Sequence, residues 1–156
     1  MKAQESMNIV GRLTMQTRDR TGRLLDQRTA NNSIVLSGRD LVAKLFIHEN
    51  IGTVSHVGVG TGAAPVNPAG NTALASELFR KPLQAIDPTT DLVVVNGTNV
   101  KITLSAELDF GEGNGALTEA GLFNGPTGGV LYNRVVFPPI NKTTDFKLAL
   151  IWEIVF

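Results

Sequence analysis

Apolar and polar residues alternate with a period of two along much of this chain, which is the pattern of strands that bury one face. The clearest case is residues 145–156, where one face carries only apolar side chains: Phe146, Leu148, Leu150, Trp152, Ile154 and Phe156. Ala149, Ile151 and Val155 make the other face less polar than a solvated face. We therefore predict a central strand, or one covered by a neighbour, with Trp152 and Phe156 anchoring the core.

Seven further segments follow the strand pattern: residues 9–17, 23–29, 54–59, 92–95, 100–109, 117–123 and 129–137. Asp19-Arg20-Thr21-Gly22 and Asn96-Gly97 predict turns that join neighbouring strands into hairpins. Residues 138–142 contain Pro138-Pro139 and are expected to form a stiff connection. Many short strands separated by turns predict a mainly β fold, an antiparallel β-sandwich of the jelly-roll or immunoglobulin-like type.

One or two short helices are expected beside the strands. Residues 38–48 place apolar side chains at helical spacing after Ser37, which we assign as the N-cap. A second helical turn is expected after Asn71 or Thr72, with Leu74 and Leu78 on one face.

The length of 156 residues is that of one domain, so residues 1–156 are expected to form a single β-sandwich domain. Residues 60–72 hold three glycines and two prolines and are interpreted as a loop insertion. Residues 1–7 have no partner in the local pattern and are interpreted as an N-terminal arm that orders on a neighbour.

Charge and composition exclude several classes of function. Fourteen basic and 14 acidic residues give a formal net charge of zero, which argues against nucleic-acid binding. Cysteine is absent, so disulfides, zinc–thiolate sites and thiol catalysis are excluded. No apolar run reaches the roughly 18 residues of a membrane span. The first residues lack the apolar stretch of a signal peptide, so synthesis in a cytoplasm is expected.

The glycine-rich segment Gly58-Val59-Gly60-Thr61-Gly62 is not followed by the Lys of a phosphate-binding loop. We interpret it as a strand end that needs backbone room at Gly58 and Gly60, and we assign the same role to Gly121. No cofactor site is predicted.

The titratable residues do not form a recognisable active site or metal site. His48 and His56 fall on different elements without carboxylates at ligand spacing. Asp109, Glu112 and Glu119 flank a glycine-rich loop, but the calcium ligand set is incomplete. Ser55 and His56 are adjacent in a predicted strand, where neighbouring side chains point to opposite faces and cannot pair. We therefore predict no catalytic or metal-ligating residue.

Residues 111–156 resemble a group of small structural proteins of tailed bacteriophages. The resemblance rests on Gly111-Glu112-Gly113-Asn114-Gly115, Leu117 to Phe123, and Arg134 to Thr143 with the closing strand. Ser55 to Gly62, followed by Thr72-Ala73-Leu74 and Glu77-Leu78, is similar to a glycine turn and short helix in the same group, and to the start of tail-collar fibre proteins.

This resemblance implies a virion protein without enzymatic activity, made in the bacterial host cytoplasm. Its partners would be further copies of itself and other virion proteins, with no nucleic acid, membrane or small-molecule substrate. The role expected first is a connector, collar or fibre-attachment subunit of the tail, neck or baseplate.

Three other functions stay open at this point. One is a capsid decoration protein, expected as a trimer. Another is a host-carbohydrate-binding module, although seven Phe, one Tyr and one Trp offer few stacking faces, with Tyr132 as the exception. The last is a small hydrolase, for which no motif is present.

Overall fold

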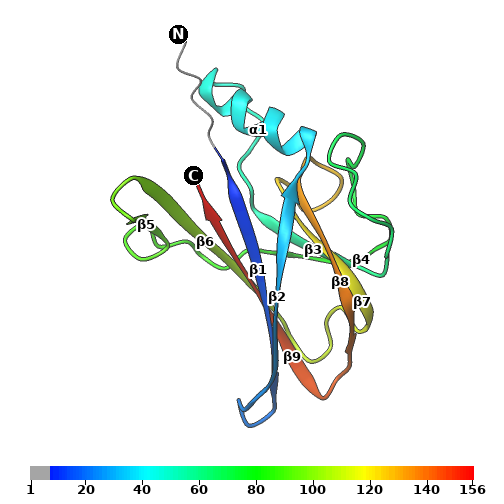
Figure 1. The fold of residues 1–156 in the computed structure, drawn as a ribbon. Coiled ribbons are helices and arrows are strands. Elements are labelled where there is room, and N and C mark those ends of the chain that lie inside the picture. The colour runs from blue at the N-terminus through cyan, green and yellow to red at the C-terminus, as the bar shows by residue number, and fades with distance from the viewer. Residues whose placement is uncertain (1–7) are drawn as a thin grey trace.

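The computed structural model describes residues 8–156, so the predicted N-terminal arm lies outside the described residues. This part of the chain forms nine strands and one helix, which are labelled in Figure 1. The strands are β1 (Val10–Asp19), β2 (Leu24–Ile34), β3 (His56–Gly60), β4 (Glu77–Pro82), β5 (Leu92–Val95), β6 (Asn99–Leu108), β7 (Gly115–Phe123), β8 (Leu131–Lys142) and β9 (Phe146–Val155), and the helix is α1 (Leu36–Phe46).

The strands form one antiparallel sheet in the order β4-β3-β7-β8-β2-β1-β9-β6-β5. The sheet curls into a half-barrel (Figure 1). The predicted mainly β, antiparallel class with a short helix is confirmed. The strand order is that of one continuous sheet and does not by itself give the two sheets of a jelly-roll or immunoglobulin-like sandwich.

The sheet changes direction at strand β2. It pairs with β1 over almost its whole length, from Gly11↔Asn32 to Arg18↔Leu24. It pairs with β8 only through Ser33↔Arg134 and Ile34↔Asn133. Because the two pairings use different residues of β2, the sheet turns there and brings β7 and β8 over β1 and β9.

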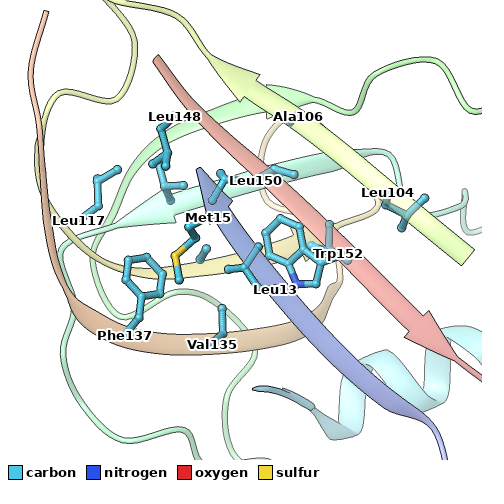
Figure 2. Close-up of a cluster of buried hydrophobic side chains, with 14 of the residues drawn as sticks. Leu13, Met15, Leu104, Ala106, Leu117, Val135, Phe137, Leu148, Leu150 and Trp152 are labelled. Carbon is cyan, nitrogen blue, oxygen red and sulfur yellow. The ribbon is translucent and has the colours of Figure 1, made fainter. Parts of the chain in front are cut away.

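The core fills the space inside the curl. The inner faces of β1, β9 and β6 present Leu13, Trp152 and Leu104 in one row, because Leu13 pairs with Trp152 and Trp152 pairs with Leu104. Figure 2 shows these side chains meeting Val135 and Phe137 from β8 on the opposite side. Strand β9 lies between β1 and β6, so its predicted central position is confirmed.

Helix α1 confirms the predicted amphipathic helix, but its start is two residues earlier and its cap is different. Val35 occupies the N-cap position without a side-chain hydrogen bond. Ser37, the predicted cap, donates its Oγ proton to the Leu131 carbonyl, 2.6 Å away on β8. Ser37 therefore ties the helix to the sheet. Val35 begins the helix because its amide bonds the Tyr132 carbonyl of β8, which fixes where the chain leaves the sheet.

The predicted second helical turn is wrong. Residues 71–76 form bends and irregular chain, and Leu78 belongs to strand β4. The amides of Ala75 and Ser76 donate to the Glu119 carboxylate and so cannot supply helical hydrogen bonds. Leu74 is still buried, in a small cluster with Val35, Phe123 and Leu131.

The predicted connection at residues 138–142 is also wrong, because β8 continues through it to Lys142. The register with β7 shifts here, from Leu117↔Ile140 to Glu119↔Val136. Pro138 and Pro139 therefore fall at a bulge, where a missing backbone N–H breaks no ladder bond.

We expect Trp152→Ala to lower the free energy of unfolding by about 3–5 kcal/mol, because the side chain is fully buried and its removal leaves a cavity. Chemical denaturation followed by circular dichroism measures this. The control Val94→Ala truncates an exposed side chain and should change stability by no more than about 0.5 kcal/mol. An unchanged midpoint for Trp152→Ala would contradict the assigned facing of β9.

Candidate assembly surface

An apolar hollow opens between helix α1 and the inner face of the sheet. Its volume is about 360 Å³, within the range of ligand-sized or side-chain-sized cavities. None of its lining residues is charged: they are Val42, Leu45, Thr53, Val54, Ile86, Ile102, Leu104, Tyr132, Ile154 and Phe156. An uncharged hollow of this kind accepts apolar groups and disfavours ions, which would lose their hydration.

Tyr132 supplies the only phenol of the chain and lies in the wall of the hollow. The residue is buried and its hydroxyl has no hydrogen-bond partner. Burial raises the pKa of Tyr132 to about 12, because the phenolate would be poorly solvated, and the nearby Arg39 opposes this shift. The sequence pointed to Tyr132 as an exposed stacking face, and its burial makes that interpretation wrong.

The apolar inner face continues past the hollow to the end of the sheet. Ile154 pairs with Ile102 and Ile102 pairs with Leu92, so these side chains share the inner face. One step further along, Val94 pairs with Val100, on the same face. Leu92, Val94 and Val100 are exposed, Val94 by 70%. We call these three residues the apolar strip.

The end of helix α1 and the residue that follows it add further apolar surface. Leu45, in the wall of the hollow, is followed by Phe46 and Ile47, which are 78% and 68% exposed. Ile86, also in the wall, is exposed as well. Clustered exposed apolar side chains are uncommon on proteins that stay monomeric and indicate an interaction surface.

The two edges of the sheet differ in how they are protected. Edge strand β4 carries charged residues and a proline: Arg80 pairs with Glu77, Lys81 pairs with Glu112, and Pro82 ends the strand. Charges and proline are the usual means of blocking edge-to-edge pairing. Edge strand β5 reads Leu92-Val93-Val94-Val95 and has none of them. The β5 edge is therefore open to a further strand.

Hydrogen bonds join the segment that follows β4 to strand β6 across the curled sheet. Gln84 donates its amide proton to the Ser105 carbonyl of β6 at 2.8 Å, and the Ser105 hydroxyl bonds the Gln84 side chain. We call this contact between Gln84 and Ser105 the closure of the sheet. Strand β5 pairs with the other half of β6 and lies outside the closure.

A buried ion pair holds the segment between β3 and β4. Arg134 Nε lies 2.8 Å from Glu119 Oε2, and both side chains are almost completely buried. The Glu119 carboxylate also accepts protons from the amides of Gly62, Ala75 and Ser76. The predicted loop 60–72 therefore lies against β7 through a carboxylate that the sequence pointed to only as an incomplete calcium ligand.

The other carboxylates proposed around the glycine-rich loop are engaged by lysines. Lys81 approaches Glu112 at 2.6 Å and Lys147 approaches Asp109 at 3.5 Å. Hydrogen bonds from backbone amides are the first cause that holds the pKa of each carboxyl below its usual range. Within residues 8–156, no group of three His, Asp or Glu side chains is placed to hold a metal ion.

The five residues assigned structural roles fall in two places. Gly58 pairs with Gly121, and a Cβ at Gly121 would lie 2.6 Å from the Asn133 carbonyl. At Gly60 a Cβ would meet the Ser76 carbonyl. Trp152 lies in the core, whereas Phe156 is half-buried and lines the hollow.

The expectation that Ser55 and His56 cannot pair is wrong. Ser55 Oγ lies 2.8 Å from His56 Nδ1, because Ser55 precedes β3 and the alternation of strand side chains does not apply to it. Burial and the positive charge of Arg80 lower the pKa of His56. A general base must become cationic after it takes a proton, so this environment disfavours the role.

Comparisons with known proteins add no relative: no family model, curated protein or solved structure matches this chain. Within the described part of the chain, α1 is the single helix, and it is too short to cross a bilayer.

Titration of the single tyrosine tests the burial of the hollow's wall. We expect the absorbance of the phenolate to appear at about pH 12. Since the folded state raises this pKa above its usual value of about 10, the stabilisation is present below pH 10 and is lost as pH rises through about 12. In Tyr132→Phe the unpartnered hydroxyl is gone, so stability should be kept or slightly raised. A phenolate that forms near pH 10 in the folded protein would contradict the account.

Glu119→Gln tests the buried ion pair. Loss of the carboxylate leaves Arg134 buried without a counter-charge and should lower the free energy of unfolding by about 3–5 kcal/mol. Hydrogen exchange should also accelerate at the amides of Gly62, Ala75 and Ser76. The control Glu153→Gln removes a partly exposed partner of Arg12 and Lys101 and should cost about 0.2–1 kcal/mol. Equal losses of stability in the two variants would refute the claim that the buried Glu119–Arg134 pair stabilises the fold more than an exposed ion pair.

Proposed function

We propose that this chain is a non-enzymatic structural subunit of a tailed bacteriophage particle, present in several copies and joined to other virion proteins. It would serve in the tail, neck or baseplate as a connector, collar or fibre-attachment subunit. In this role the two facing parts of the curled sheet act as the layers of a sandwich of the jelly-roll or immunoglobulin-like type, a rigid body with contacts at its open end.

The observation that carries the proposal is the concentration of unprotected apolar surface at one end of the molecule. Leu45 and Ile86 are exposed and line the hollow. The apolar strip continues from the lining residue Ile102 to the open β5 edge. Exposed strand edges lead to aggregation unless they are blocked or occupied. A partner subunit that covers this end would remove both the exposed apolar area and the unpaired backbone groups.

Charge agrees with association and with the absence of a nucleic-acid partner. The net charge of zero gives no long-range repulsion between copies. Most charged side chains near the sheet are already paired within the chain, such as Arg12 and Lys101 with Glu153. The resemblance of residues 111–156 to phage structural proteins supplies the kind of particle, and the surface supplies the reason for assembly.

Electron microscopy of a purified particle tests the assignment directly. Density for this chain in a ring at the tail, neck or baseplate is the expected result. Threefold clusters on the shell would replace the proposal with a capsid decoration role. Absence of the chain from purified particles would refute the proposal altogether.

A charge placed on the apolar strip tests the role of the open end. We expect Val94→Lys to fold normally, because the side chain is 70% exposed, and to be incorporated into particles at least about tenfold less than the wild type. Quantitative mass spectrometry of particles measures incorporation. The matched control Thr21→Lys lies in the exposed β1–β2 turn and should be incorporated normally. Equal incorporation of the two variants would contradict a contact at the apolar strip.

A further inference from the structure

We infer that strand β5 pairs with β5 of a second copy, antiparallel, about a twofold axis at Val93. This inference rests on the proposed assembly role and names its partner at one edge. It follows from the direction of the backbone groups, the length of extended chain at the edge and the absence of charge along it.

Hydrogen bonds already present fix which backbone groups of β5 are free. Val100 exchanges both of its backbone hydrogen bonds with Phe156, the residue after β9. The N–H and C=O groups of Val100 therefore point to the β9 side of β6. The alternate residues of β6 must then point toward β5, as the bond from the Thr103 amide to the Asp91 carbonyl confirms. Val93 and Val95 face β6 in this ladder, and Leu92 and Val94 point their N–H and C=O groups outward.

The extended part of the edge allows one twofold register. Asn96 has a φ of 52°, so the strand conformation ends at Val95 and only Leu92 and Val94 can offer outward groups. A twofold axis at Val93 sets Leu92 opposite Val94 of the second copy, and Val94 opposite its Leu92. Both outward residues of each copy are then hydrogen-bonded. An axis at Val94 would set Leu92 against Asn96, which is not extended.

Self-pairing sets a strand against its own copy, so a charged residue on the strand would lie close to like charge. Strand β5 contains no charged residue, so this repulsion is absent. In the Val93 register, the exposed side chains of Leu92 and Val94 also become cross-strand neighbours on the inner face and shield each other from water.

The difference between the two edges decides the kind of assembly. Pairing of β5 with the β4 edge of another copy would repeat from copy to copy and produce an open filament. The charged residues and Pro82 disfavour that contact at β4. Pairing of β5 with β5 uses each edge once and closes the contact at two copies. A four-residue strand buries less than the roughly 1,200 Å² of a stable interface, so the isolated pair is expected to be weak.

Cysteine cross-linking tests the register, because the chain has no cysteine of its own. In the proposed pair Val93 faces Val93 of the second copy at a non-hydrogen-bonded position, where Cα atoms lie about 4.5 Å apart. This separation suits a disulfide. Val95 shares the outer face with Val93 but would lie roughly 13 Å from its counterpart, four residues along the strand.

We expect Val93→Cys to form a disulfide-linked dimer under mild oxidation at least about tenfold faster than Val95→Cys, in keeping with the distances at the two positions. Circular dichroism checks that both variants are folded. Equal rates, or no dimer from Val93→Cys, would overturn the inference.

A second variant removes the outward amide while leaving the fold intact. Val94→Pro deletes an N–H that faces away from β6, so the edge strand should tolerate it. Sedimentation velocity over a wide concentration range should show self-association of the wild type weakened at least about tenfold by this substitution, about 1.4 kcal/mol. The control Val94→Thr keeps the amide and changes only the side chain, so it should weaken association clearly less than Val94→Pro does. Unchanged association of Val94→Pro would overturn the inference.

These results are separable from those on the particle. A chain that cross-links through Val93→Cys but is missing from particles would refute the phage role and leave the β5 contact standing. A chain found in particles whose Val93→Cys variant does not cross-link, purified or assembled, would refute the β5 contact alone.

Discussion

The curled sheet is closed by hydrogen bonds between Gln84, which follows β4, and Ser105 of β6, and this closure leaves the edge strand β5 outside. The core beneath the closure is packed between the strands of the curled sheet and α1. Beyond it the same inner face continues into the apolar strip without a cover. The molecule therefore has one part that is stable by its own packing and one part whose backbone and side chains lack partners. The position of the closure along β6 determines where the packed part ends and the uncovered part begins.

The buried Glu119–Arg134 pair helps to position Gln84, and so the closure, from the β4 edge of the sheet. It holds the segment between β3 and β4 against β7, and β4 then leads directly to Gln84. A buried ion pair is seldom the most stable filling for a core, but it accepts only one arrangement of hydrogen bonds. Here it aligns the amides of residues 62, 75 and 76 with one carboxylate. The path of an irregular 16-residue connection (residues 61–76) is fixed by this pair rather than by secondary structure.

Local pattern predicted much of the fold and little of the candidate surface. Alternation identified β9 and β6, and Asn96-Gly97 identified the turn between β5 and β6, because these signals act between near neighbours. Pro138 and Ser37 were misinterpreted because a bulge and a contact with β8 decide their roles. The pairing of Glu119 with Arg134 depends on the β7–β8 register. Likewise, alternation shows which residues of β5 are apolar but not that β5 is an edge strand, which only the strand order reveals.

Hydrogen exchange in the assembled state measures the central claim most directly, which is that the open end is completed by other subunits. The amides of Leu92 and Val94 point outward and should exchange rapidly in dilute purified protein. In assembled particles both should become strongly protected, while the outward amides of β4 should exchange at the same rate in the two samples. Protection of Leu92 and Val94 that is identical in dilute protein and particles would contradict the account.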